Sequence, residues 1–345
     1  MPQLPRSVDV AIVGGGFAGM STAWWLARRG VRDVCVLERE PELGRYASGR
    51  SAGMGRQLAE DDIVTGLTVI GAAHLRTLFP QVWKETGGIL TFDRKDHARD
   101  YAGRAERMGI ATKRMTRAEI LAVWPQLEHV EIDAGLRVPS DGLIDIVALL
   151  AAYSDGARAG GIGVIGETPV ERIIATGRGA TLLTNRGSVV ARVVVDATGA
   201  WAGRTTADPP LDSFKRHVYT LEAIPPSGAP FLWHLGEREL YVRPIGEQIM
   251  VSPCDTTATL PGDQQPDPGG EALMRARFTG SPLHAAPIAR AWACQRTFPP
   301  RWGMKLERDQ QRPWLVWACG LGGHGATASA AVGETVAGLV IDALG

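Results

Sequence analysis

The stretch VDVAIVGGGFAGM at residues 8–20, together with VCVLE at residues 34–38, decides the fold of this chain. The apolar residues of 8–13 predict a short buried strand, and those of 34–37 predict a second one. Residues 20–29 between them predict a helix that ends before Gly30. The order of strand, glycine turn, helix and strand predicts a βαβ unit of a parallel sheet.

The turn after the first strand carries the spacing G-x-G-x-x-G, formed by Gly14, Gly16 and Gly19. In that fingerprint the first glycine makes a tight turn, the second lets the backbone approach a pyrophosphate, and the third lets helix and strand pack closely. The N-terminus of the helix adds free N–H groups and the positive end of its dipole. Glu38, at the end of the second strand, can accept hydrogen bonds from ribose hydroxyls. An ordinary βαβ turn is the weaker alternative, and we predict a dinucleotide site.

The composition is that of a soluble globular enzyme. The 345 residues suffice for two lobes with a large core, and 45% of them are hydrophobic. The 37 basic and 37 acidic side chains cancel, so we expect neither nucleic acid nor an anionic membrane as a partner. We expect no membrane span and no signal peptide, because no apolar stretch approaches the required length. The four cysteines lack metal-binding spacing, which predicts no metal site, reduced thiols and a cytoplasmic location.

Residues 43–55, LGRYASGRSAGMG, follow the second strand and are rich in glycine, alanine and serine. Small side chains and free backbone groups suit a chain that packs against a flat polar ring or a diphosphate. A flexible surface loop has the same composition. The position directly after the fingerprint favours contact with the cofactor.

The middle of the chain departs from the alternation of strand and helix. Apolar spacing predicts helices at 61–80, 93–108, 117–124 and 144–159, with a short strand at 89–92. The helix at 93–108 is highly charged, and we expect it to be solvated. This region therefore predicts a second lobe inserted into the nucleotide-binding one.

The nucleotide-binding lobe resumes with short strands at 168–174, 180–183 and 188–192, which we expect to be antiparallel. The apolar run at 192–196 then ends in Ala197-Thr-Gly199. Small residues at such a strand end let the backbone approach a nucleotide, and a plain buried strand with a tight turn is the alternative.

Five motifs occur in order along the chain: the glycine fingerprint with Glu38, ASGRSAG at 47–53, PSDG at 139–142, DATGAW at 196–201 and GGHG at 322–325. With these motifs the chain resembles, over nearly its whole length, the FAD-dependent D-amino-acid oxidase superfamily. Glycine oxidases, sarcosine oxidases and D-arginine dehydrogenase-like proteins belong to that superfamily. The resemblance implies tightly bound FAD and oxidation of a C–N bond in an amino acid or related small amine.

The resemblance also implies a two-domain α/β (α+β) fold. A Rossmann-type, GR2-like FAD-binding domain would comprise residues 1–80, 135–210 and 305–345. A substrate domain built on a mixed antiparallel sheet would comprise residues 81–134 and 211–304. The residues that the resemblance places at FAD are Gly14, Gly16, Phe17, Ala18, Gly19, Glu38, Arg39, Ser48, Arg50, Ser51, Ala52, Val170, Ala197, Gly199, Trp201, Gly322, Gly323, Gly325, Ala326 and Thr327.

The substrate side is expected on later strands. Residues 239–252 predict a hairpin, and period-two alternation puts Tyr241 and Arg243 on one face of it. In the resembled family the tyrosine of Tyr-x-x-Pro commonly faces the substrate, which ranks Tyr241 above Arg243. Arg296 aligns with the family's arginine that binds the substrate carboxylate, a role that suits a planar and always charged guanidinium. The alternative for Tyr241 and Arg243 is that they are surface residues of a half-exposed strand. The alternative for Arg296 is an arginine on an edge strand without a ligand.

Three residues near the C-terminus bear on the flavin. A helix beginning near Gly325 can direct its dipole at the flavin edge where negative charge collects on reduction. His324 either flanks the flavin or caps the turn. Cys294 aligns with the cysteine that binds flavin covalently in monomeric sarcosine oxidase, but neutral surroundings favour a buried, inert thiol and noncovalent FAD.

Departures from the family's pattern concern the substrate. The segment after Arg56 lacks a histidine and a tyrosine that D-arginine dehydrogenases have there, residues 202–212 are short and contain Pro209-Pro210, and residues 299–303 replace an Asp-Gly turn. Met250 stands where sarcosine oxidases have a lysine that promotes reaction with oxygen, which favours a dehydrogenase. An FAD-dependent 2-hydroxy-acid or polyol-phosphate dehydrogenase and a cofactor-binding protein without chemistry stay open. So do the electron acceptor (oxygen, quinone or a carrier) and the oligomeric state.

Overall fold

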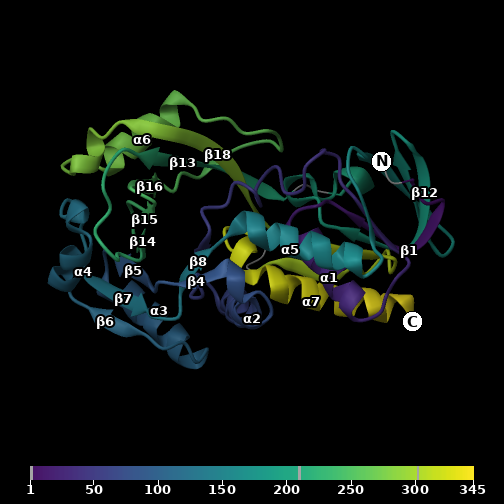
Figure 1. The fold of residues 1–345 in the computed structure, drawn as a ribbon, viewed down its shortest axis with the longest axis horizontal. Helices are drawn as coiled ribbons and strands as arrows, with labels where there is room; N and C mark the ends of the chain where they lie inside the picture. The colour runs from purple at the N-terminus through teal and green to yellow at the C-terminus, as the bar shows by residue number, and fades with distance from the viewer. Residues whose placement is uncertain (1–2, 209–210, 301–302) are drawn as a thin grey trace.

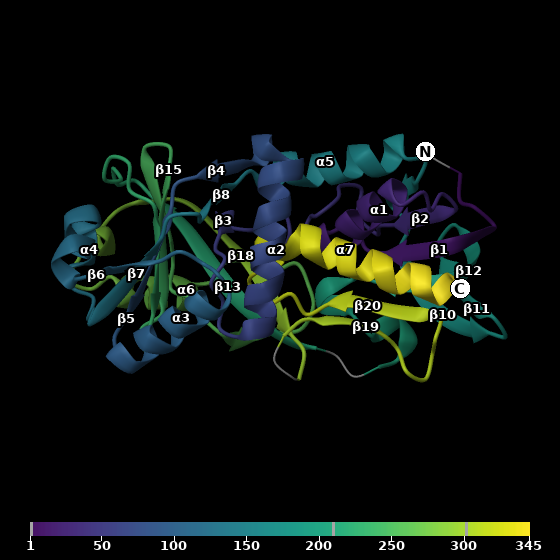
Figure 2. The same ribbon diagram turned by 90° about the horizontal axis from the view of Figure 1, so that it is seen from below.

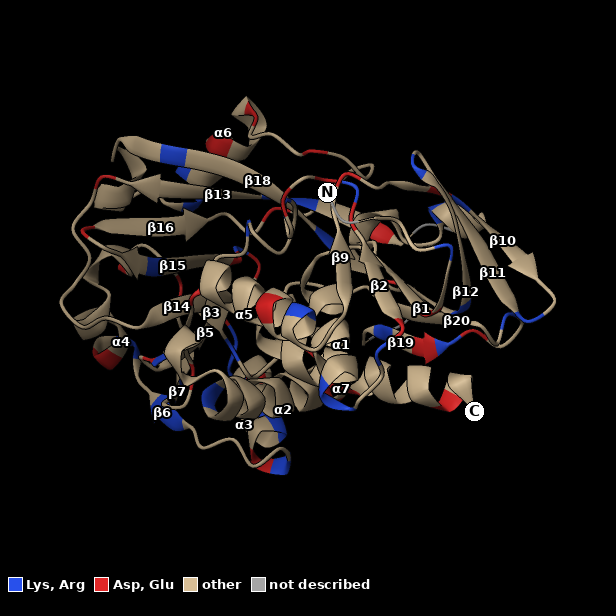
Figure 3. Cartoon of the chain, turned by 45° about the vertical axis from the view of Figure 1, so that its right-hand side comes forward, with Lys and Arg blue, Asp and Glu red and all other residues tan. Residues whose placement is uncertain are grey.

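The computed structural model describes residues 3–208, 211–300 and 303–345. Its ribbon forms two lobes side by side, with both chain ends at the same lobe (Figure 1). Basic and acidic residues are interspersed over both lobes (Figure 3), in keeping with the balanced composition. Two segments named above, Pro209-Pro210 and Arg301-Trp302 within 299–303, lie outside the described residues.

The lobe that holds the chain ends is built on an eight-stranded sheet. Its strands run in the order β10-β11-β12-β1-β2-β9, with β20 beside the end of β12 and β19 beside β20. β1 lies parallel to both β12 and β2, while β10, β11 and β12 are antiparallel, as predicted. The strands are β1 (Ser7–Val13), β2 (Val34–Leu37), β9 (Gly163–Ile165), β10 (Val170–Thr176), β11 (Gly179–Thr184), β12 (Gly187–Asp196), β19 (Lys305–Arg308) and β20 (Leu315–Cys319).

Both faces of the parallel strands are buried, which explains why their sequences are almost entirely apolar. Val10 and Ile12 of β1 pack into the core with the helices, whereas Ala11 and Val13 join a second core on the other face. The helices on the first face are α1 (Phe17–Arg28), α5 (Ile146–Ala159) and α7 (Gly325–Leu344), with α2 (Asp62–Leu78) packed against α7 (Figure 2). The predicted helices at 61–80 and 144–159 are confirmed within two residues at each end.

The turn between β1 and α1 is as tight as the glycine spacing requires. Gly14 has φ +110°, and a Cβ on it would lie 2.5 Å from the carbonyl oxygen of Ala197. A Cβ on Gly19 would lie 1.9 Å from the carbonyl oxygen of Gly14. Only glycine therefore permits this approach of helix and strand. α1 begins at Phe17, three residues before the predicted start.

The second lobe is built on a nine-stranded mixed sheet. Its strand order is β17-β13-β16-β15-β14-β5-β7-β6, with β18 also paired to β13. β14 and β5 are parallel and the other pairs are antiparallel, so the predicted mixed sheet is confirmed. The strands are β5 (Gly88–Phe92), β6 (Lys113–Met115), β7 (Ala134–Val138), β13 (Asp212–Leu221), β14 (Phe231–Leu235), β15 (Leu240–Ile245), β16 (Gln248–Ser252), β17 (Thr257–Ala258) and β18 (Ile288–Phe298).

The two faces of this sheet have different neighbours. Val242 and Val251 pack on one face against α4 (Arg117–Val123) and α6 (Pro268–Arg277). The opposite face turns towards the other lobe, and Tyr241 there packs with Ala52. α3 (Lys95–Arg107), expected to be solvated, buries Ala98, Tyr101 and Ala105 in a further core. Its high charge concealed that small apolar face.

A three-stranded sheet of β3 (Met54–Gly55), β8 (Gly142–Ile144) and β4 (Trp83–Glu85) lies where the lobes meet (Figure 2). Between β12 and β13, the helices of the described residues 197–208 are two short 3-10 helices, η3 (Gly199–Trp201) and η4 (Arg204–Thr206), in keeping with the expected shortening. The remaining 3-10 helices are η1 (Pro80–Val82), η2 (Pro125–Leu127) and η5 (Pro282–His284).

The last helix, α7, corrects one expectation. It has the length and hydropathy of a membrane-crossing segment, although no stretch of that kind was predicted. In this fold 56% of that segment is buried inside the protein. Trp25 donates through Nε1 to the carbonyl oxygen of Ala330 at 2.8 Å, and Tyr153 and Ser329 share a hydrogen bond of 2.9 Å. α7 is thus a core helix of the first lobe.

Candidate active site

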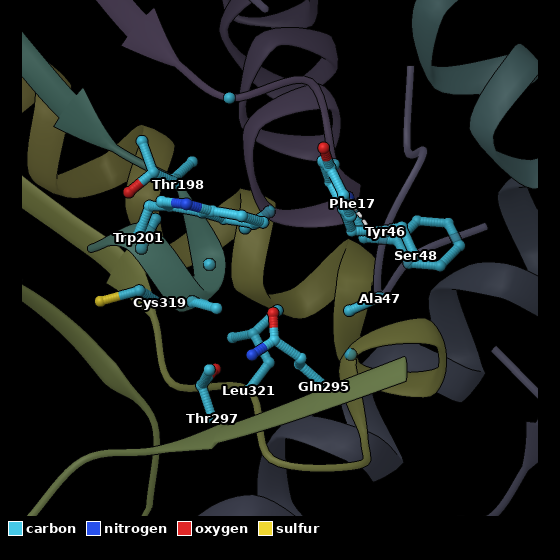
Figure 4. Close-up of a pocket in the computed structure, with 18 of the residues that line it drawn as sticks. Phe17, Tyr46, Ala47, Ser48, Thr198, Trp201, Gln295, Thr297, Cys319 and Leu321 are labelled. Atoms are coloured by element: carbon cyan, nitrogen blue, oxygen red, sulfur yellow. Dashed lines mark hydrogen bonds between the residues drawn. The ribbon is translucent and has the colours of Figure 1, made fainter. Parts of the chain in front are cut away.

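A long cavity of about 340 Å³ opens at the carboxyl ends of the parallel strands. Its walls come from the turn after β1, the end of β2, residues 44–51, the turn after β12, the end of β18 and the turn before α7. Figure 4 shows Phe17 and Ser48 on one side of this cavity, and Thr198 and Trp201 on another. The carboxyl edge of a doubly wound sheet is where such folds bind nucleotides.

The turn after β1 and the loop 44–51 fix each other through hydrogen bonds. The hydroxyl of Ser48 accepts the backbone N–H of Phe17 at 3.0 Å, at the first turn of α1. The carboxylate of Glu38 accepts the backbone N–H of Gly15 through Oε2 and that of Glu40 through Oε1. Glu38 is therefore held at the cavity wall, with the N-terminus of α1 open to an anion.

A stack of flat groups lines the end of the cavity nearest Glu38. The guanidinium carbon of Arg39 lies 3.7 Å from the ring centre of Trp201 and 4.7 Å from that of Tyr46. The rings of Tyr46 and Trp201 are 4.8 Å apart. Sequence reasoning named Arg39 and Trp201 but missed Tyr46, because its loop was read only for small residues.

Most of the residues predicted to contact the cofactor line this cavity. Of the others, Gly19 packs behind the turn, and Arg50 donates to Asp263 and to the carbonyl oxygens of Gln264 and Ala293. Those that line the cavity are Gly14, Gly16, Phe17, Ala18, Glu38, Arg39, Ser48, Ser51, Val170, Ala197, Gly199, Trp201, Gly322, Gly323, Gly325 and Ala326.

A second, smaller cavity of about 20 Å³ adjoins the first, and Ser51, Arg296 and Gly323 line both. It lies between residues 51–56, the inner face of the nine-stranded sheet and the start of α7. Its remaining lining residues are Ala52, Gly53, Met54, Arg56, Arg216, Trp233, Tyr241, His324 and Thr327. Two of the residues predicted to contact the cofactor, Ala52 and Thr327, line this smaller cavity instead of the long one.

Arg296 and Tyr241, predicted from separate strands, meet at this second cavity. Arg296 donates through Nη1 to the sulfur of Cys294 at 2.8 Å and to the carbonyl oxygen of Gln295 at 3.2 Å. Tyr241 is 1% exposed, and its hydroxyl has no hydrogen-bond partner among the described residues. Burial raises the pKa of Tyr241 well above its usual range, so the hydroxyl stays protonated and available to a ligand.

Two arginines of this cavity were not predicted as site residues. Arg56 is 2% exposed, stacks over the ring of Trp233 at 4.2 Å, and leaves Nε and Nη1 without a partner in the described structure. Arg216 likewise has an unpartnered Nε, and its Nη1 lies 4.0 Å from Glu239. No signal in the sequence pointed to them, because Arg216 is flanked by the polar Lys215 and His217 and no local pattern reveals the direction of either arginine side chain.

His324 also lines the second cavity and makes no side-chain cap on α7. Its Nε2 lies 2.6 Å from Nη2 of Arg56 and 3.4 Å from a carboxylate oxygen of Glu60. A guanidinium can only donate, so Nε2 must accept and the ring proton sits on Nδ1. Burial lowers the pKa of His324 to about 4, although Glu60 acts in the opposite direction.

We expect the ring of His324 to stay uncharged from pH 8 down to about pH 5, because its pKa lies near 4. Protonation would set a second positive charge against Arg56. NMR titration of protein labelled in its histidine rings measures this, with His324→Asn identifying the signal by its absence. A His324 ring that titrates near pH 6.5 would contradict the arrangement.

Arg243, the other predicted substrate residue, lies outside the lining of both cavities. Its Nη1 donates to the carbonyl oxygen of Ala52, and its Nε donates to that of Pro244 at 3.3 Å. It therefore anchors the loop at Ala52 to β15. Its assignment to the substrate stays a prediction.

The expectation of neutral surroundings for Cys294 is wrong. The guanidinium of Arg296 lies against its sulfur, because the two side chains are on the same face of β18. Covalent attachment also requires that the sulfur be accessible to the cofactor. However, Cys294 is 1% exposed and lines neither cavity.

We therefore still expect the cofactor to be bound without a covalent link, now because Cys294 has no access to it. Acid precipitation should leave the flavin in the supernatant, where its absorbance can be measured. Flavin that stays in the pellet of the wild type, but not of Cys294→Ala, would reverse this prediction.

Comparison with known proteins agrees with the fold and this pair of cavities. The sequence pattern of the family described as "FAD dependent oxidoreductase" matches residues 9–339. A long cavity at the carboxyl edge of a Rossmann-type sheet, a smaller cavity beside it and a match of this length define a flavin-dependent oxidoreductase. The chain belongs to the D-amino-acid oxidase family of FAD-dependent oxidoreductases, and its cofactor is FAD.

Among curated proteins, the chain is 30% identical to glycine oxidase of Geobacillus kaustophilus over 215 residues, which is 58% of this chain and 56% of that enzyme. It is also 30% identical to dimethylglycine dehydrogenase of Rattus norvegicus over 215 residues, which is 58% of this chain and 24% of that protein. The matched part is thus less than two thirds of either relative.

Solved structures extend the likeness of fold to nearly the whole chain. L-proline dehydrogenase from P. horikoshii superposes with a TM-score of 0.88 at 22% identity, covering 98% of this chain and 94% of that one. Glycine oxidase from Geobacillus kaustophilus superposes with a TM-score of 0.83 at 24% identity, covering 98% and 95%.

The residues at the long cavity fit FAD. Gly14 and Gly16 bring the turn to the N-terminus of α1 without side chains, so a pyrophosphate could approach the positive end of the helix dipole there. Glu38 would present its carboxylate to the ribose, and Arg39 with Trp201 would present flat groups beside it. Gly325 and Ala326, at the start of α7, line the same cavity, and the positive end of that helix dipole would face the flavin.

Proposed function

We propose that this protein oxidises the C–N bond of an amino acid or N-substituted amino acid. The observation that carries the proposal is that Arg296 lines both the cofactor cavity and the smaller cavity beside it. A guanidinium there can bind a carboxylate bidentately and so hold the neighbouring α-carbon next to the cofactor. The names of the relatives, glycine oxidase and dimethylglycine dehydrogenase, support this substrate class.

FAD bound in the long cavity supplies the two-electron acceptor of the reaction. The substrate loses a hydride from its α-carbon and a proton from its nitrogen, and water then hydrolyses the resulting C=N bond to a carbonyl compound and an amine. Arg296 holds the carboxylate, and the hydroxyl of Tyr241 donates a further hydrogen bond to it. No side chain need act as the base if the amine enters uncharged.

Three further assignments are part of this proposal. The cofactor domain comprises residues 1–80, 135–210 and 305–345, and the substrate domain residues 81–134 and 211–304. The buried Met250 of β16, in place of a lysine, supports a dehydrogenase that passes electrons to an acceptor other than oxygen. A cytoplasmic location is supported by four cysteines that are all free and buried.

The proposal is tested on purified holoenzyme by anaerobic addition of a panel of amino acids and N-methyl amino acids. The true substrate should bleach the visible absorbance band of the oxidised flavin, because it reduces the cofactor. Release of ammonia or an alkylamine must accompany the bleaching. Bleaching by 2-hydroxy acids or polyol phosphates alone, without amine release, would replace the proposal by C–O oxidation. Reduction by dithionite but by no substrate would favour a cofactor-binding protein.

A further inference from the structure

The second cavity contains more positive charge than one carboxylate requires. Arg56, Arg216 and Arg296 all line it, from three different segments of the chain. Nε and Nη1 of Arg56 and Nε of Arg216 are buried without a hydrogen-bond partner among the described residues. Buried donors of this kind are costly unless a ligand satisfies them.

The three arginines are not equivalent in position. Arg296 lines both cavities and therefore lies on the cofactor side, whereas Arg56 and Arg216 line only the smaller cavity. Arg216 on β13 pairs with Cys294 on β18, two residues from Arg296, which puts both arginines on the same face of the sheet. Arg56 reaches the cavity from the opposite wall, after β3, and stacks on Trp233.

Two carboxylates partly balance these charges. Glu60 is hydrogen-bonded to Nη2 of Arg56, and Arg56 brings the pKa of Glu60 down to about 2 against the effect of burial. Glu239 accepts Nε1–H of Trp233 at 2.8 Å and reaches Arg216 only at 4.0 Å. Both are partly exposed, with side chains 41% and 30% accessible. Glu60 and Glu239 therefore do not accept hydrogen bonds from Nε and Nη1 of Arg56 or from Nε of Arg216.

The unpartnered donors favour a particular ligand. In the proposed reaction the amine enters uncharged, so a simple amino acid brings one carboxylate, which Arg296 holds. The buried N–H groups of Arg56 and Arg216 then stay without an acceptor. A second acidic group on the substrate supplies acceptors for them.

We propose that the smaller cavity binds an amino acid that carries a second acidic group, with Arg296 on the α-carboxylate and Arg56 and Arg216 on the distal one. The inference rests on the proposed function and adds the substrate class. The small cavity requires a short spacer, so aspartate, glutamate and their N-methyl derivatives are the probes. Arg56 and Arg216 become the residues that determine specificity.

Binding is tested first, without turnover. Succinate and butyrate, the four-carbon acid with a methyl group in place of the second carboxylate, are titrated into oxidised holoenzyme, and the perturbation of the flavin spectrum gives each dissociation constant. Succinate should bind roughly 10- to 100-fold more tightly, the scale of one charge-assisted contact. Arg216→Met should abolish the difference and Arg216→Lys should retain part of it. Arg114→Met, an exposed arginine of the same lobe, is the matched control and should change nothing.

Turnover is tested next. Both enantiomers of aspartate and glutamate are compared with asparagine and glutamine as reductants of the flavin. The acidic member of each pair should have the higher kcat/KM by a similar factor, and Arg56→Met should remove that preference. Retention of FAD shows that the Arg56→Met variant is folded. If that variant does not fold, Arg216→Met is used to test the same preference for acidic substrates.

The outcomes separate this inference from the function on which it rests. Equal binding of succinate and butyrate, or a preference for neutral amino acids, overturns the acidic substrate while leaving C–N oxidation standing. If succinate binds more tightly and this depends on Arg216, but no amine reduces the flavin, the site for a second acidic group is supported and the proposed C–N oxidation is ruled out.

Discussion

Gly16→Val is expected to yield a protein that purifies colourless and takes up no FAD. Gly16 lines the cofactor cavity at the N-terminus of α1, and a Cβ there would lie 3.0 Å from the hydroxyl of Ser48. The two further methyl groups of valine would occupy the space of the pyrophosphate and disturb the hydrogen bond between Ser48 and Phe17. The ratio of flavin to protein absorbance, before and after incubation with excess FAD, measures the effect.

Gly66→Val provides the matched control. Gly66 lies in α2, and a Cβ on it would meet nothing within 4 Å. This variant should purify yellow with a normal flavin content. If Gly16→Val also binds FAD with the affinity of the wild type, the assignment of the fingerprint to the pyrophosphate is wrong.

The second large effect is expected from Arg296→Leu. Loss of the carboxylate contact should lower kcat/KM on the true substrate by roughly 100-fold, as expected for a charge-assisted bidentate contact worth about 1.5–3 kcal/mol. FAD content should stay unchanged, because the variant leaves the glycine turn after β1 and Glu38, which would hold the pyrophosphate and ribose, as they are. Anaerobic flavin reduction over a range of substrate concentrations measures the change.

Arg290→Leu is the control for this variant, since Arg290 is an exposed arginine on the same strand, β18. It should leave KM and the rate of flavin reduction as they are. An Arg296→Leu enzyme with unchanged kcat/KM would rule out Arg296 as the carboxylate anchor and leave that role to Arg216.

The cofactor side of the molecule could be predicted from the sequence because its determinants are local. The turn at Gly14 needs glycine for its backbone angle, and the end of the next strand, Glu38, follows at a fixed distance along the chain. Each feature is specified by residues close in sequence, and each appears at the cavity in the structure.

The substrate side could be predicted only in part, because it is assembled from segments far apart in the chain. Alternation along one strand and the family's Tyr-x-x-Pro pattern predicted that Tyr241 faces the substrate. Alignment with a family motif predicted that Arg296 binds the substrate carboxylate. The direction of Arg56 depends on Trp233, which lies well over a hundred residues away, and that of Arg216 depends on its pairing with β18. No local pattern encodes such contacts.

That Arg296 lines both cavities has a thermodynamic consequence. With the function proposed above, one guanidinium would face two anions: a carboxylate in the smaller cavity and the negative charge that gathers on the cofactor side on reduction. Each anion would weaken the hold of Arg296 on the other, and this linkage is reciprocal. Ligand binding would therefore lower the reduction potential of the cofactor, and reduction would lower the affinity for an anionic ligand. The residue that captures the substrate before electron transfer would thus hold the product less tightly afterwards.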